Sequence, residues 1–150
     1  TPLYSSAASD VYKRQGILFG PRVGFSVGLL SIAITDISFF GAGYHTLVDS
    51  PCMGGLGLAS GLLWGGKKDL SRFELAIGGF LLTLIWDVVT SLLGFILYFP
   101  TTESALTSAL VGLFLPTPYP LGPAHELSTA ALMGLLGVPI VKAIRQRRGW

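Results

Sequence analysis

Charged residues are scarce in this chain. They make up 12% of its 150 residues, whereas about 25% is usual for a soluble domain. The formal net charge is only +2, and the sequence shows no basic patch of the kind that binds nucleic acid. Hydrophobic residues, in contrast, account for 51% of the chain. This balance argues against an ordinary water-soluble domain and predicts a membrane protein with no nucleic-acid partner.

Cysteine is almost absent as well. Cys52 stands alone, which excludes an intrachain disulfide and a metal site made only of cysteines. His45, Asp49, His125 and Glu126 are suitable metal ligands by type, but no close pair such as HxxxH or HxH occurs. The sequence therefore predicts neither a metal nor another cofactor.

The longest apolar stretch runs from Phe73 to Phe99, and Asp87 is its only charged residue after Glu74. A hydrocarbon core about 30 Å thick requires roughly 20 helical residues, so this stretch can span a bilayer. Its small and polar residues recur at helical spacing and form a polar seam: Gly79, Thr83, Asp87, Thr90, Ser91 and Gly94. Because a carboxylate in mid-bilayer is costly, we expect Asp87 to face protein or water.

The other apolar segments complete a helical bundle. Residues 23–40 and 124–144 are predicted to span the membrane, and 51–65 to form a short glycine-rich span. Residues 104–115 are too short for a span and are interpreted as a re-entrant or surface helix, and residues 41–50 as an outer loop. The predicted fold class is all-α, an integral-membrane helical bundle. Glycines four residues apart predict close helix packing at two sets of positions: Gly20, Gly24 and Gly28, and Gly57, Gly61 and Gly65.

Residues 1–15, TPLYSSAASDVYKRQ, differ in character from the rest of the chain. They resemble the translated read-through of a sequencing adapter, so we interpret them as non-native and leave them out of the fold reasoning. A genuine cytoplasmic tail is the alternative. On the first interpretation, residues 16–150 form a single membrane domain, residues 16–20 end a truncated helix, and native helices before them are missing.

Basic residues after position 15 occur in only three places: Arg22, the loop 67–72 and the C-terminal tail from Lys142. Basic loops usually stay in the cytoplasm, so all three places, and with them the C-terminus, are predicted to lie there. Acids and histidines then gather in the outer half of the bundle: Asp36, His45, Asp49, Glu103, His125 and Glu126. This asymmetry favours a cationic or neutral ligand over a polyanion.

The segment LFGPRVGFSVGLLSIAITD, residues 18–36, resembles a helix pair of the substrate-binding S components of energy-coupling factor (ECF) vitamin transporters. These commonly read apolar–Gly-Pro-x-x-Gly–apolar. The later segments agree in order: a glycine-rich span, a basic loop, a long helix, a proline-containing outer loop and a last helix. That helix ends in Pro139 and a basic tail, so the resemblance covers about residues 16–148.

The resemblance implies a six-helix bundle, of which about four full spans and a stub are present. It implies a multi-pass subunit of a prokaryotic cytoplasmic membrane that captures a vitamin or related micronutrient from outside. Its partners would be a transmembrane coupling protein and two cytoplasmic ATPases. The chain itself has no phosphate-binding GxxxxGK[ST] motif, so it is not predicted to be an enzyme. It also lacks the lysine expected early in the last helix of biotin-type members.

Six residues are candidates for substrate binding: Asp87, His125, Glu126, Tyr119, Asp36 and His45. Asp87 leads because intramembrane carboxylates are usually functional, although a structural bond to a neighbouring helix is the alternative. His125 and Glu126 begin the last helix, where Glu126 could act only on the helix N-terminus. Tyr119 is either a ring-stacking residue or an interfacial anchor, and Asp36 and His45 could simply be solvated.

Two other classes of function stay open: a small intramembrane enzyme and a structural membrane subunit. Ser128 follows His125 by three residues, as a nucleophile and its base can on a helix, but no oxyanion motif surrounds them. Changing an acid or histidine would abolish turnover in an enzyme, whereas a structural subunit would bind no small molecule.

Overall fold

The structure, a computed structural model, describes residues 2–96, 101–114 and 123–148. Every regular element within these ranges is a helix, which confirms the predicted all-α class. In chain order the elements are α1 (Pro2–Phe19), α2 (Pro21–Thr35), η1 (Asp36–Phe40), α3 (Tyr44–Trp64), α4 (Arg72–Phe95), α5 (Thr102–Phe114), α6 (Pro123–Leu132), η2 (Met133–Gly137) and α7 (Val138–Arg148). The two η elements are π-helical turns that continue the preceding helices.

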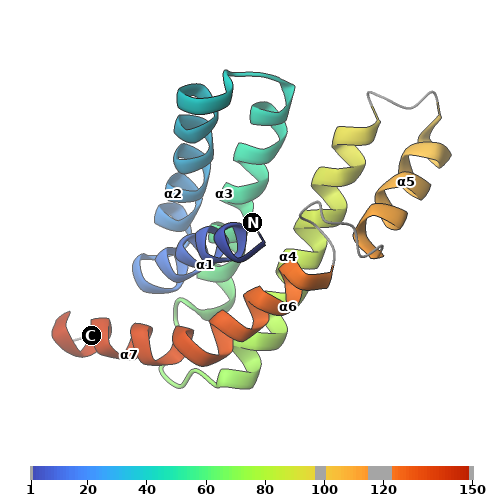
Figure 1. Cartoon of the computed structure of the whole chain (residues 1–150). Coiled ribbons are helices and arrows are strands. Elements are labelled where there is room, and N and C mark those ends of the chain that lie inside the picture. Colours follow the sequence, from blue (N-terminus) through green and yellow to red (C-terminus); the bar gives the residue numbers. More distant parts are fainter. Residues whose placement is uncertain (1, 97–100, 115–122, 149–150) are drawn as a thin grey trace.

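Among the described residues, three helical stretches are long and apolar enough to cross a membrane: Pro21–Phe39, Arg72–Gly94 and Glu126–Arg147. They match three of the four predicted spans. The fourth, at 51–65, belongs to α3, which has 21 residues but does not qualify as a span on its composition. Figure 1 shows α2 and α3 side by side, α4 beyond α3, and the α6–α7 helix crossing the lower part of the molecule.

α4 has a buried face and an exposed face of opposite character. Its buried residues follow each other at every fourth position: Leu75, Gly79, Thr83 and Asp87. Its exposed hydrophobic residues form a second row: Phe73, Ile77, Leu81, Ile85, Val89 and Leu93. The apolar row suits contact with lipid, so the polar seam faces protein. Asp87 is 0% exposed, which confirms the prediction that its carboxylate avoids lipid.

α2 and α3 approach each other through glycines. A Cβ atom at Gly24 would lie 2.5 Å from the carbonyl oxygen of Gly57, and one at Gly28 would lie 2.5 Å from that of Met53. Neither position can hold a side chain unless the helices separate, so the predicted glycine packing is confirmed here. Gly20 has a different role, since its φ of 95° provides the sharp turn between α1 and α2.

α3 begins earlier than the sequence predicts. The expected loop at 41–50 is wrong for most of its length, because the helix starts at Tyr44 and continues through Pro51. The Gly43 N–H donates a hydrogen bond of 3.3 Å to the Thr46 hydroxyl at this end. Pro51 removes only one backbone donor, and the packing of α3 against α2 holds the helix together. His45 and Asp49 therefore lie on a helix.

The basic segments meet at one end of the bundle. Arg145 of α7 donates hydrogen bonds to the carbonyl oxygens of Gly65, at 3.3 Å, and Ile17, at 3.5 Å. Lys67 pairs with Glu74 at the start of α4. The turn after α1, the loop after α3 and α7 thus share this end, as the topology prediction requires.

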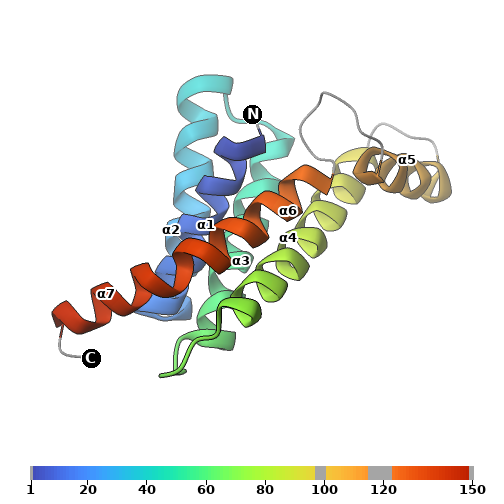
Figure 2. The same ribbon diagram turned by 60° about the horizontal axis from the view of Figure 1, so that its bottom comes forward.

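α5 packs against α4, and α1 packs against α2, α3 and α6. Figure 2 shows α1 between the α2–α3 pair and the α6–α7 helix. Residues 2–15 continue the helix of residues 16–19 as one element. Because the sequence predicts residues 1–15 to be non-native, they receive no functional assignment below.

Gly57→Ala is expected to destabilise the protein, because the added methyl group collides with the backbone of Gly24. Overpacking of this kind costs about 1–3 kcal/mol. Gly55 lies on the same helix, and a methyl group added there would have nothing within 4 Å, so Gly55→Ala is the matched control and should be neutral or slightly stabilising. Thermal unfolding in detergent measures both; equal melting temperatures would contradict the close contact of α2 and α3.

Candidate functional site

Four buried polar side chains come from two adjacent helices, α4 and α6. Thr83, Asp87 and Thr129 are 0% exposed, and Glu126 is 2% exposed. We call them the α4–α6 polar cluster. Burying two carboxylates is costly unless each is hydrogen-bonded or paired. Ionisable residues inside a membrane domain therefore mark a functional site by default.

Small residues fix the register of α4 against the last helix. A Cβ atom at Gly79 would meet Met133 and Thr129, and one at Gly134 would meet Ala76. Gly79 thus faces Thr129 and Met133, whereas the earlier residue Ala76 faces the later residue Gly134. The two helices run antiparallel, so one turn forward on α4 corresponds to one turn back on α6.

This register places the members of the cluster at similar depth. Thr83 follows Gly79 by one turn and is level with Glu126, which precedes Thr129 by about one turn. Asp87, a further turn along α4, is level with the first turn of α6. Both carboxylates therefore lie toward the end of the bundle opposite the basic segments.

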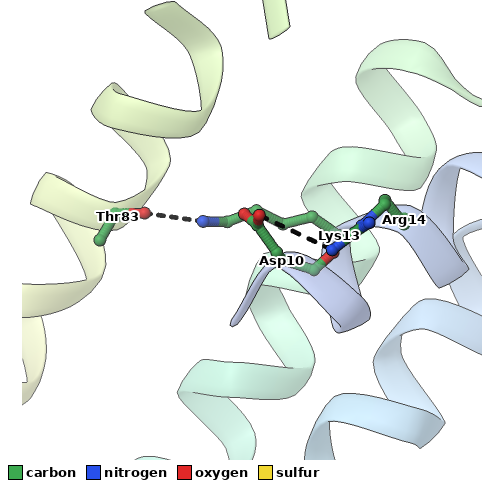
Figure 3. A network of polar contacts seen from close by, with 4 residues as sticks. All are labelled: Asp10, Lys13, Arg14 and Thr83. Carbon is green, nitrogen blue, oxygen red and sulfur yellow. Dashed lines mark hydrogen bonds and ion pairs between the residues drawn. The ribbon is translucent and has the colours of Figure 1, made fainter. Parts of the chain in front are cut away.

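Figure 3 shows one member of the cluster, Thr83, accepting a hydrogen bond from a side chain of α1. Lys13 Nζ, from α1, donates to Thr83 Oγ1 at 2.7 Å. Asp10 and Asp87 interact electrostatically with the Lys13 ammonium group, and Arg14 pairs with Asp10 at 3.7 Å. Lys13 belongs to the segment predicted to be non-native, so no role is assigned to it. Its position nevertheless shows that Thr83 faces an interior space in which a donor fits.

A second group of polar residues lies where η1 meets the start of α3. His45 Nε2 is 3.6 Å from Asp36 Oδ2, and the Asp36 residue is 9% exposed. Burial raises the pKa of Asp49, and the neighbouring Asp36 carboxylate adds to that effect while His45 opposes it. Nearby, the Tyr44 hydroxyl donates to the Leu93 carbonyl oxygen at 3.3 Å and joins α3 to the far end of α4.

The predicted site residues divide among these places. Asp87 and Glu126 join the α4–α6 polar cluster, whereas Asp36 and His45 pair with each other on the α2–α3 side. His125 lies in the first turn of α6, and Tyr119 lies outside the described residues. Thr129 is not among the predicted residues, although its spacing of three from Glu126 places it on the same helix face.

The cluster is suited to binding a neutral polar molecule. Its carboxylate and hydroxyl oxygens accept hydrogen bonds. The only basic residue of α4 is Arg72, at the start of that helix. Trp86, the neighbour of Asp87, packs against the Met53 and Leu56 group and adds an aromatic surface. Within the described ranges, no three histidine, cysteine or acidic residues gather as a metal site requires.

Comparison with known families places most of the chain in a transporter family. The model of the family described as "ECF-type riboflavin transporter, S component" matches residues 14–146. The match includes α2, α3, α4, α6 and most of α7, and therefore every described residue of the α4–α6 polar cluster. No curated protein and no solved structure matches the chain.

Asp49→Asn is expected to raise the melting temperature at neutral pH. The pKa of Asp49 is raised in the folded protein, so its ionised form opposes folding once the pH exceeds the ordinary carboxyl pKa. The gain should therefore vanish in acid, where Asp49 is protonated in both states. Glu103→Gln, at an exposed position, is the control for the loss of one carboxyl group from the surface. A gain that is equal at every pH would argue against a buried charge at Asp49.

Proposed function

The chain belongs to the family of ECF-type riboflavin transporter S components, and from this we propose that it captures riboflavin, or a closely related flavin, in the membrane. Membership makes it a membrane-embedded substrate-binding subunit of a transporter, in a family of transport proteins rather than enzymes. The observation that carries the proposed substrate site is the α4–α6 polar cluster, two buried carboxylates and two hydroxyls within the matched region.

Riboflavin has the chemistry that this cluster favours. It is neutral, and it combines a flat aromatic ring with a ring N–H and a chain of hydroxyl groups. Asp87 and Glu126 are proposed to accept hydrogen bonds from these donors, and Thr83 and Thr129 to donate or accept. Trp86 is proposed to stack against the ring, which is the usual use of an aromatic side chain beside a flat ligand.

The remaining candidate residues are proposed to lie around the entrance. His125 in the first turn of α6 and Tyr119 before it are close in sequence to Glu126. Asp36 and His45 lie together at the end of the bundle away from the basic segments, with His45 Nε2 3.6 Å from Asp36 Oδ2. We propose that this end faces the outside and that the basic end, with the C-terminus, faces the cytoplasm of a prokaryotic cell. The partners proposed there are a transmembrane coupling protein and two ATPases.

Riboflavin is expected to bind the purified full chain with one molecule per protein, measured by titration calorimetry in detergent. Asp87→Asn and Glu126→Gln should each weaken binding about tenfold or more, because a hydrogen bond to a charged group contributes about 1.5–3 kcal/mol. Ile85→Ala is the matched control, since Ile85 lies on the exposed face of α4 and should leave the affinity unchanged.

Melting temperatures of the same variants separate binding from structure. If the role of Asp87 is to bind the substrate, Asp87→Asn should weaken binding while changing the melting temperature of the ligand-free protein little. A clear fall in melting temperature would instead favour a structural bond. If wild-type protein binds no riboflavin and gains no stability from it, the proposed substrate is wrong.

Flavin mononucleotide, which adds a phosphate to riboflavin, is expected to bind at least about tenfold more weakly than riboflavin. The anionic phosphate would approach two carboxylates with no cation assigned to this end of the bundle. Competition between the two flavins, followed by flavin fluorescence, measures the difference. Equal affinity would contradict the proposal that the acidic residues surround the ligand.

A further inference from the structure

A cavity of about 790 Å³ opens at the basic end of the bundle, away from the α4–α6 polar cluster. It lies where the end of α1, the start of α2, the loop after α3 and α7 come together. Four cationic side chains from two of these segments line it: Lys67, Lys68, Lys142 and Arg145. We call it the basic cavity, and the proposed substrate site does not use it.

Two of the four cationic side chains already have partners within the protein, and two have no ion pair among the described residues. Lys67 pairs with Glu74, and Arg145 donates to the carbonyl oxygens of Gly65 and Ile17. Lys68 and Lys142 have no ion-pair partner among the residues that the structure describes. Two cations that line one cavity, with no ion-pair partner among the described residues, attract an anion. The positive charge of the cavity therefore suits a negatively charged ligand group.

Part of the wall of the basic cavity is apolar. Ile17, Leu18 and Pro21 line it together with the glycines of the α3 end. A free inorganic anion would gain nothing from this wall, because it offers no hydrogen-bonding side chains. In a molecule with an anionic head and a hydrocarbon chain, the head would contact the cationic residues and the chain the apolar ones.

The cavity also lies at the depth where a lipid headgroup belongs. The first apolar span starts at Pro21, which lines the cavity, and the last one ends at Arg147, one residue after the lining residue Gln146. Span ends mark the boundary between hydrocarbon and headgroups. Basic cavities between membrane helices at the cytoplasmic boundary are suited to anionic headgroups, which are concentrated in that leaflet.

From this combination we infer that the basic cavity binds the phosphate group of an anionic phospholipid. Lys68 and Lys142 contact the phosphate, Arg145 keeps the loop after α3 joined to α7, and the acyl chain begins beside Pro21, which lines the cavity and is partly exposed. A bound lipid would connect segments that are far apart in the sequence. The inference uses only the basic end and holds whatever the substrate of the opposite end.

The test uses the full chain in detergent with phosphatidylglycerol and phosphatidylcholine added in equal amounts, and native mass spectrometry counts the lipid retained. Wild-type protein should retain phosphatidylglycerol selectively. Lys68→Gln with Lys142→Gln should weaken that binding about tenfold or more. The control, Arg22→Gln with Arg147→Gln, removes the same charge from exposed positions that do not line the cavity and should change it less than about twofold.

Further measurements distinguish a bound phospholipid from other possible occupants of the basic cavity. Inorganic phosphate should not displace the lipid, and if it does so as readily as a short-chain phosphatidylglycerol, the cavity is a site for free anions. Equal losses in the two double variants would show diffuse surface attraction, and no loss in either would place the lipid elsewhere. If the Lys68 and Lys142 variant keeps its lipid but no longer co-purifies with the coupling protein, the cavity binds protein instead. Each of these four results would overturn the inference.

Discussion

The cost of placing a polar group in hydrocarbon is the constraint on which this structure depends. α4 satisfies it by repeating its small and polar residues every fourth position, so that Gly79, Thr83 and Asp87 share one buried face. The opposite row, which includes Ile77 and Ile85, is exposed and apolar. Once α4 must bury that face, a second helix with matching small and polar residues has to cover it. The last helix does so, and the α4–α6 polar cluster is the result.

Close backbone contact is the second requirement, and glycine meets it. Lipid tails are as apolar as leucine, so membrane helices gain little by hiding apolar surface from one another and associate mainly through tight packing. Gly24 and Gly57 allow α2 and α3 to touch along their backbones. Gly79 and Gly134 let α4 and the last helix pack closely, because an added Cβ atom would press on the side chains of Met133 and Ala76. Exposed hydrophobic rows on the outside then remain available to lipid.

The two ends of the bundle carry opposite charge and, in our proposals, opposite partners. Asp36, Asp87 and Glu126 lie toward one end, where a neutral flavin with many hydrogen-bond donors is the proposed ligand. Lys68 and Lys142 lie at the other, where an anionic lipid is proposed. A carboxylate site that excludes anions and a cationic site that attracts them can coexist in one small chain because they lie at different depths along the spans.

The sequence alone determined the all-α membrane class, the two faces of α4 and the packing role of the glycines, because each depends on a helical period that is visible in the residues themselves. It misplaced the start of α3, since a proline at position 51 resembles a helix boundary and only packing against α2 carries the helix through it. Tertiary structure decided the rest. Thr83 reaches the level of Glu126, and Lys68 and Lys142 line one cavity, only after helices distant in the chain have packed in one register. Contacts of that kind depend on how whole helix faces fit together, and no local pattern encodes them.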